Sequence, residues 1–237
     1  MLALLDHRTP KEAEKSLLAH GHRVFRLPAY PRLPAPVAAH ADLLLFFAPE
    51  EILSTKGYFN IAGDTLLEIS SLAKKPLRLI KDEPGDTYPN DVLLNAVLLG
   101  DTLFCNPKTV AKRIFISLAN EKTIAVKQGY TKCSILPVGS RALITEDAAI
   151  ANLGRSHGFE VLLIEKGFVS LPGYDTGFLG GASSFSPYTE TDEIFFCGNL
   201  ESHPDGKKIQ DFCARFQKEA ISLGDFPLLD VGSIFLI

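Results

Sequence analysis

The chain has 237 residues, of which 46% are hydrophobic and 22% are charged, and its formal net charge is −4. These proportions are typical of a globular protein with a sizeable core, organised as one large domain or two small ones. No basic stripe is visible, so a nucleic-acid partner is not expected. No apolar run approaches the roughly 20 residues that cross a bilayer, so a membrane partner is not expected. The first apolar run ends at Asp6, too early for a signal peptide, and we expect a strand there.

The four cysteines are Cys105, Cys133, Cys197 and Cys213, and no two of them form a Cys-x-x-Cys pair. A zinc or thioredoxin-like motif therefore has no support, and a core-rich chain of this size does not need a disulfide scaffold. We expect a cytoplasmic protein with reduced thiols. His, Cys and carboxylate residues show no familiar ligand spacing, so we expect no metal and no other cofactor.

Apolar runs alternate with helical patterns along the whole chain, as in an α/β protein. Strands are expected at 2–5, 22–27, 43–47, 77–81, 95–99, 102–105, 123–127, 141–145, 159–164, 193–197, 220–223 and 234–237. Helices are expected from the N-cap Thr9 to Gly21, from the cap Asn106-Pro107 to about Leu118, at about 147–157 and after 203–205. Residues 50–73 contain helical patches broken by Gly57 and Gly63.

These elements group into five strand–helix–strand units with polar loops. The loops carry Asp42, Asp91, Cys133, Asp175 and Asp230, at intervals of roughly 40 to 55 residues, a period typical of repeat architectures. The last run is expected to pair beside the first unit and close a ring, which avoids exposed edge strands. The alternative is an open α/β sheet such as a doubly wound fold, but the extra strand-like segment before each helix favours the ring. We therefore predict one domain over residues 1–237, a five-fold pseudosymmetric α/β propeller around a central channel.

Five short motifs carry a resemblance to a known fold. They are His40-Ala-Asp42, Tyr88-Pro-Asn-Asp-Val92, Gln128-Gly-Tyr-Thr-Lys-Cys-Ser134, Pro172-Gly-Tyr-Asp-Thr-Gly-Phe-Leu-Gly-Gly-Ala182 and His203-Pro-Asp205. Together they resemble an uncharacterised bacterial family of the pentein fold, the α/β propeller of the guanidino-group-modifying enzymes. That superfamily includes deiminases, dimethylarginine hydrolases and amidinotransferases. The resemblance covers nearly the whole chain and implies the fold, but it does not name a reaction.

Enzymes of this superfamily use a Cys nucleophile, a His within a His-x-Asp motif and carboxylates that hold a guanidinium or amidine. His40-Ala-Asp42 matches the His-x-Asp pattern. The superfamily places its nucleophile in a late repeat, often after a Gly-Gly stretch, whereas Gly180-Gly181 is followed here by Ala-Ser-Ser-Phe. Cys133, two loops after His40, would have to serve instead, in a permuted ring.

Attack on a guanidinium carbon needs a strong nucleophile, carboxylates that orient the cation and an acid that protonates the departing amine. Cys133 is the candidate nucleophile, and Lys132 together with a substrate cation would lower the pKa of its thiol. The alternative is a structural cysteine at a strand end. His40 is the candidate general acid and base, with Asp42 orienting it or binding substrate. The alternative is an exposed loop histidine, with Asp42 closing the turn.

The other polar loop residues are candidate ligands for a small cationic substrate. They are Asn90, Asp91, Lys132, Tyr174, Asp175 and Asp230. Several of them lie beside Pro or Gly, where Asx residues often simply close turns. Gly177 to Gly181 lacks the Lys-Ser/Thr ending of a phosphate-binding loop, so it indicates close backbone packing or a close approach to a ligand.

Two classes of function stay open at this point. The first is a Cys-dependent hydrolase or transferase that acts on a guanidino, amidino or related C–N substrate in an acidic central channel. The second is a non-catalytic pentein used for binding, as in the ribosome anti-association initiation factor. Fold-level analogy alone does not decide between them, and either one leaves room for a homo-oligomer.

Overall fold

The computed structural model describes residues 1–237 and has a mixed α/β fold. Its strands form five separate sheets. Three sheets have three strands each: β3 (Phe46–Phe47), β4 (Ile52–Thr55) and β5 (Leu77–Ile80); β6 (Val97–Leu99), β7 (Thr102–Cys105) and β8 (Lys122–Ala125); β9 (Leu136–Gly139), β10 (Ala142–Thr145) and β11 (Glu160–Leu163). The fourth has β13 (Glu193–Phe196) and β14 (Glu219–Ser222), and the fifth orders its strands as β12 (Ser184–Phe185), β15 (Ile234–Leu236), β1 (Leu2–Asp6) and β2 (Arg23–Leu27).

The sheets repeat one local plan. An antiparallel hairpin such as β3–β4, β6–β7 or β9–β10 comes first, and a helix then returns the chain to a strand parallel to the second hairpin strand. The extra strand expected before each helix is therefore present as the first strand of each hairpin.

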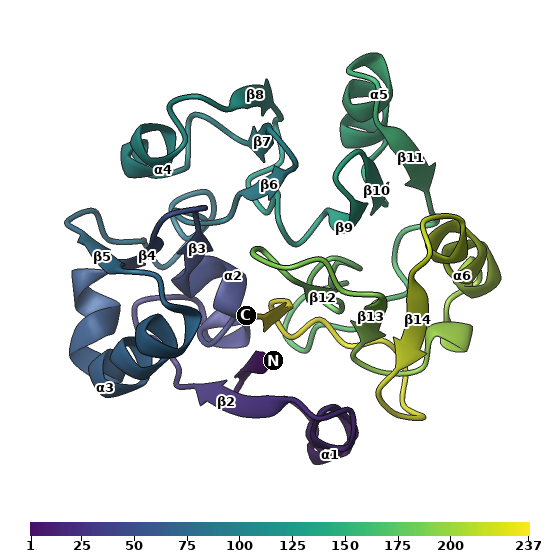
Figure 1. Cartoon of the computed structure of the whole chain (residues 1–237), viewed down its shortest axis with the longest axis horizontal. Helices are drawn as coiled ribbons and strands as arrows, with labels where there is room; N and C mark the ends of the chain where they lie inside the picture. Colours follow the sequence, from purple (N-terminus) through teal and green to yellow (C-terminus); the bar gives the residue numbers. More distant parts are fainter.

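The longer helices lie on the outside of the molecule (Figure 1). The six α-helices are α1 (Lys11–Ala19), α2 (Ala41–Leu44), α3 (Lys56–Ala73), α4 (Lys112–Ser117), α5 (Ala148–Ser156) and α6 (Gly206–Arg215). Each of the outer helices buries one apolar face against its own sheet, as α5 does with Ile150 and Ala151. None of the helices is long and apolar enough to span a bilayer.

The two chain ends meet near the middle of the molecule (Figure 1). Strand β15 pairs antiparallel with β1, and Leu2 and Ile237 exchange backbone hydrogen bonds of 2.7 and 2.9 Å. The prediction that the last run pairs beside the first unit is confirmed. The same plan thus recurs here, with one strand of the antiparallel pair supplied by each end of the chain.

Several expected element boundaries were wrong. The run 43–47 begins as the short helix α2 and becomes a strand only at Phe46. The sequence could not show this, because a short continuous apolar run has neither the period of a helix nor that of a strand. Helix α1 has Pro10 at its N-cap position and no side-chain cap, so Thr9 does not cap it. Asn106 closes a turn by accepting a hydrogen bond from the backbone N–H of Lys108, and helix α4 starts later, at Lys112.

The segment 50–73 differs most from the expectation. Residues Ile52–Thr55 form strand β4, and α3 then continues past Gly57 without a break, but a kink at the non-helical Ala62 divides it directly before Gly63. Packing of the buried side chains of α3 outweighs the weak helix propensity of glycine. Strands β9 and β12 were not expected, because β9 contains Pro137 and β12 has only two residues.

Helix α5 offers a direct test of the local sequence signals. Asp147 caps it by accepting hydrogen bonds from the N–H groups of Ala149 and Ile150 at 2.8 and 3.1 Å. Asp147→Ala is expected to lower the free energy of unfolding by about 1 kcal/mol, whereas Asp147→Asn keeps the acceptor and most of the stability. Urea denaturation measures both, with the exposed Asp211→Ala as the control; equal losses for the Ala and Asn variants would contradict the cap.

Candidate active site

Polar residues from five distant loops meet in the interior. The segments that lead into β3, β6, β9, β12 and β15 contribute Asp42, Asn95, Cys133, Gly180 and Ser233, respectively. All five residues are buried. The hairpin plan therefore brings together residues that are up to 191 positions apart in the chain.

The carboxylate of Asp42 is the acceptor at the middle of this cluster. Its Oδ2 atom accepts a hydrogen bond of 2.7 Å from the hydroxyl of Ser233 and one of 3.2 Å from the thiol of Cys133. Its Oδ1 atom is equally buried but has no hydrogen-bond partner. One oxygen of this buried carboxylate therefore still lacks a donor, a costly arrangement in a protein interior.

Asn95 joins the Asp42 segment to the Cys133 segment. Its Nδ2 atom donates to the backbone carbonyl of Asp42 at 3.1 Å and to Sγ of Cys133 at 3.3 Å, while its Oδ1 atom accepts from the N–H of Lys132 at 2.7 Å. A single amide side chain thus positions the thiol against the carboxylate.

Gly180 and Gly181 allow the fourth segment to come close enough. A Cβ atom on Gly180 would lie 2.4 Å from the carbonyl oxygen of Cys133, and one on Gly181 would lie 2.1 Å from Oδ1 of Asp230. The expectation of close backbone packing at this stretch is confirmed, since no side chain larger than hydrogen fits at either position.

His40 lies between two buried carboxylates. Its Nδ1 atom is 3.8 Å from Oδ1 of Asp230, and its Nε2 atom is 4.0 Å from Oδ2 of Asp6. Asp6 is also paired with Arg8 at 2.5 Å. No hydrogen bond joins His40 to Cys133. The structure therefore buries the histidine in an acidic environment, in place of the exposed loop histidine of the alternative.

Burial controls the electrostatics of the cluster. It raises the pKa of the Cys133 thiol well above its usual range, and the negative charges of Asp42 and Asp230 raise it further. Burial likewise raises the pKa of Asp230, against the influence of His40. The thiol is consequently a protonated hydrogen-bond donor to Asp42 in the free protein, and the expected lowering by Lys132 does not prevail.

Lys132 points inward and is only 1% exposed. Its ammonium donates to Oγ of Ser233 at 2.9 Å and to the carbonyl oxygen of Gly180 at 3.2 Å. Burial lowers the pKa of Lys132, and the charge of Asp42 opposes that shift. Lys132 is thus a member of the cluster and does not face solvent.

The remaining predicted substrate ligands form no hydrogen bond with the Cys133 cluster. Asp91 is fully buried and accepts a hydrogen bond from the phenol of Tyr130, while its Oδ1 atom has no partner. Burial raises the pKa of Asp91. Asn90, Tyr174 and Asp175 are exposed in loops.

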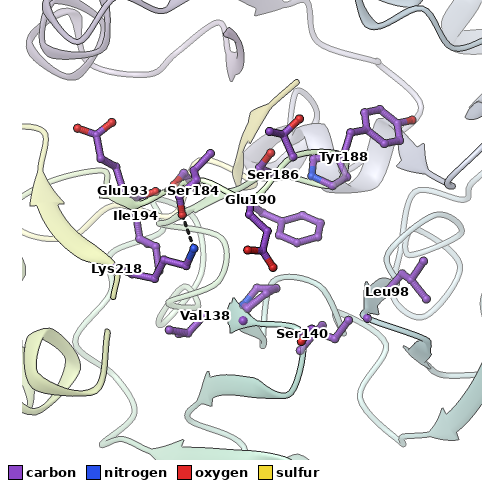
Figure 2. Close-up of a pocket in the computed structure, with 18 residues that line it drawn as sticks. Leu98, Val138, Ser140, Ser184, Ser186, Tyr188, Glu190, Glu193, Ile194 and Lys218 are labelled. Atoms are coloured by element: carbon purple, nitrogen blue, oxygen red, sulfur yellow. Dashed lines mark hydrogen bonds between the residues drawn. The ribbon is translucent and has the colours of Figure 1, made fainter. Parts of the chain in front are cut away.

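One narrow cavity adjoins the cluster, and it shares part of its wall with a larger one. The narrow cavity next to Asp42, of about 10 Å³, holds at most about one water molecule and is lined by apolar side chains that include Leu98 and Phe185. The same two residues also line a larger cavity of about 300 Å³. Figure 2 shows this larger cavity, with the carboxylate of Glu190 directed toward Val138 and Ser140. Leu98 and Phe185 thus belong to the walls of both cavities.

Sequence reasoning missed Asn95, Ser233 and Asp6. Asp6 ends a buried strand and Asn95 interrupts an apolar run, so each carried a weak signal of a buried polar role. Ser233 carried none, because a serine beside glycine in a loop is ordinary. Its backbone has a φ of 69°, a left-handed conformation that a serine rarely adopts, and only the structure reveals it.

Glu146, near Asp230, provides a test of the acidity of this region. Its carboxylate accepts from the N–H of Leu179 at 3.1 Å, and burial together with the charge of Asp230 raises its pKa to about 7. The folded protein therefore keeps this proton up to about pH 7, whereas the unfolded chain loses it between about pH 4 and 5. Glu146 accordingly lowers the free energy of unfolding as the pH rises from about 4.5 to 7, and the loss persists above pH 7.

Glu146→Gln keeps the acceptor for Leu179 and removes the charge. It is expected to raise the free energy of unfolding at pH 8 by about 1 to 3 kcal/mol, with little change at pH 4.5. Urea denaturation across this pH range measures the effect, with the exposed Glu201→Gln as the control. A constant difference from the native protein at every pH would contradict the assignment.

Comparison with solved structures finds the same fold in guanidino-modifying enzymes. A dimethylarginine dimethylaminohydrolase adduct with S-methyl-L-thiocitrulline matches with a TM-score of 0.59 and 9% identity, covering 93% of this chain and 91% of that one. C. jejuni agmatine deiminase matches with a TM-score of 0.56 and 7% identity, covering 94% of this chain and 87% of the deiminase chain. An amidinotransferase from Microseira wollei, of the saxitoxin biosynthetic pathway, matches with a TM-score of 0.53 and 10% identity. This match covers 97% of this chain and 93% of the amidinotransferase chain. These neighbours confirm the predicted resemblance to the pentein fold.

The curated proteins contain no match to this sequence. A family model, in contrast, matches residues 4–235, which is almost the entire chain. The chain therefore belongs to a family of unknown function (DUF6873).

Proposed function

We propose that the five sheets are the blades of an α/β propeller and that its centre carries out Cys-dependent chemistry on the C–N bond of a small guanidino or amidino cation. The observation that carries this proposal is the contact between Cys133 and Asp42, 3.2 Å from thiol to carboxylate, with the second carboxylate oxygen free of partners. A guanidinium that donated to this free oxygen would place its electrophilic carbon beside the thiol. The pentein neighbours support the class of chemistry, and the reaction itself is our proposal.

The roles follow from the polar contacts. The Cys133 thiol gives its proton to Asp42 as the sulfur forms a bond to the guanidinium or amidinium carbon. The C–N bond then breaks, and the departing amine takes a proton from His40, beside which Asp6 and Asp230 place negative charge. Water, or an acceptor amine in a transferase, finally adds to the carbon and gives a proton to His40; the C–S bond breaks, and the sulfur recovers its proton from Asp42. Binding of the cation next to the thiol favours the thiolate, and this compensates for the raised pKa of the free protein.

The outer residues would then contact the rest of the substrate. Asp91 with its partnerless Oδ1 atom supports a second cation contact. Tyr174, Asp175 and Asn90 are exposed in loops, where they would meet only the distal part of a ligand or a partner molecule. Asp230 and Lys132 are already engaged in the interior and would set its charge.

A specific observation also favours the second function, a non-catalytic binding protein. The thiol is protonated and buried, and the space beside Asp42 has room for about one water molecule. A catalytic centre must open before a guanidinium can enter it, whereas a binding protein would keep this packed centre and use an outer surface. Reactivity of Cys133 in the folded protein separates the two functions.

A pair of alkylating reagents of equal size tests the proposal. The cation 2-chloroacetamidine is expected to alkylate Cys133 about tenfold or more faster than neutral 2-chloroacetamide, after each rate is divided by that with free cysteine, because the cation is held by Asp42. With the neutral reagent the rate should keep rising above pH 9, since burial raises the pKa of the thiol. Peptide mass spectrometry measures both rates.

The variants of this experiment make it decisive. Asp42→Asn should abolish the preference for the cation, and Cys133→Ser should abolish the labelled peptide. Cys105, Cys197 and Cys213 are buried and serve as internal controls for unfolding. Equal normalised rates for the two reagents would reject the catalytic proposal, and absence of labelling by either reagent would favour the binding protein.

A further inference from the structure

The surroundings of the Lys132 ammonium consist of groups that stabilise a cation. The nitrogen donates to Oγ of Ser233 at 2.9 Å and to the carbonyl oxygen of Gly180 at 3.2 Å. The ring centroids of Phe185 and Phe235 lie 5.5 and 5.8 Å from it, within the distance of cation–π attraction. The hydroxyl of Ser233 donates its proton to Oδ2 of Asp42, and the carbonyl oxygen and the ring faces have no proton to donate, so none of these neighbours stabilises a neutral amine through its lone pair.

The rings of Phe185 and Phe235 are neighbours on adjacent strands. Strands β12 and β15 are parallel neighbours, and Phe185 is the register partner of Phe235. Side chains of register partners project from the same face of a sheet. The sheet therefore presents two adjacent aromatic side chains to one ammonium group.

The hydroxyl of Ser233 connects this ammonium to negative charge. It donates to Oδ2 of Asp42 at 2.7 Å and accepts from Lys132, so the positive and negative groups polarise it in the same direction. A buried charge is tolerated when such partners are in place. The relay of ammonium, hydroxyl and carboxylate satisfies that condition without a direct ion pair.

We propose that the interior of this protein contains a built primary-ammonium site and that Lys132 is its resident, covalently tethered ligand. The site comprises the Ser233 hydroxyl, the Gly180 carbonyl, the rings of Phe185 and Phe235, and Asp42 beyond the hydroxyl. Its ligand class is a small alkylammonium. This proposal does not rest on the proposed reaction, because it requires neither the thiol of Cys133 nor turnover.

Removal of the tether tests the site directly. Lys132→Ala removes the side-chain atoms from Cγ to Nζ, which are the atoms of n-propylammonium, and leaves a space of that shape. The variant is expected to unfold about 6 to 15 °C below the native protein, because Asp42 and Ser233 lose their cation. Added n-propylammonium chloride should raise its Tm in a saturable, dose-dependent way. Neutral n-propanol and sodium chloride at the same concentrations should not, and neither should n-propylammonium act on the native protein.

A second variant keeps the test decisive if Lys132→Ala does not fold. Lys132→Met fills nearly the same volume without the charge, and it should also lower the Tm by several degrees and show no response to n-propylammonium. Lys218→Met is the matched control, because the ammonium of Lys218 donates only to the carbonyl oxygen of Thr191 at the rim of the larger cavity (Figure 2). It should leave the Tm within about 2 °C of the native value.

Two outcomes would overturn the proposal. In the first, Lys132→Met is as stable as the native protein, which would mean that the site needs no cation. In the second, n-propanol stabilises Lys132→Ala as well as n-propylammonium does, which would mean that the space is simply apolar. Both readouts are unfolding temperatures, so they stand apart from the labelling of Cys133 that tests the proposed function.

Discussion

The buried carboxylate of Asp42 is the contact on which the interior depends. It accepts hydrogen bonds from Ser233 near one end of the chain and from Cys133 in the middle, and Asn95 binds its backbone carbonyl. None of these residues is close to another in sequence, so the contacts form only when the separate sheets have packed together. A single buried acceptor with distant donors makes the tertiary arrangement specific, because any shifted packing would leave the charge unsatisfied.

The interior brings acidic and basic side chains together away from solvent. Asp42 and Asp230 are negative groups beside a buried thiol, and His40 and Lys132 are the basic groups that adjoin them. The same acids that would hold a cationic substrate raise the pKa of Cys133 when no substrate is present. A protonated thiol in the free protein is therefore compatible with both functions, and it gives no measure of the reactivity in a complex with a cation.

Much of the architecture could be predicted from the sequence, because it depends on local signals. Apolar runs marked most strands, Asp147 and the glycine after α5 marked a helix, and the even spacing of polar loops indicated the repeat. The location of His40, Asp42, Cys133 and Asp230 in one interior also followed from that repeat. The direction in which each side chain points could not be predicted from that repeat. Lys132 and Cys133 are adjacent in the sequence, and only the structure shows that Lys132 meets the rings of Phe185 and Phe235 while Cys133 meets Asp42. Nor could the bonding of Ser233 be predicted, since it depends on an unusual backbone conformation.

The resident ammonium and the proposed chemistry compete for the same negative charge. An external guanidinium beside Asp42 would stand close to the cation of Lys132, and two like charges in a dry interior repel strongly. The free Oδ1 atom of Asp42 is the acceptor left for such a second cation, and Phe185 would have to move away from the narrow cavity to admit it. A substrate that used this oxygen would have to overcome the repulsion of the ammonium, displace the ammonium from Ser233, or bind as Lys132 gives up its proton. Under the proposed function, Lys132 would therefore oppose the entry of a cationic ligand, and its contacts with Ser233 and Gly180 would set the strength of that opposition.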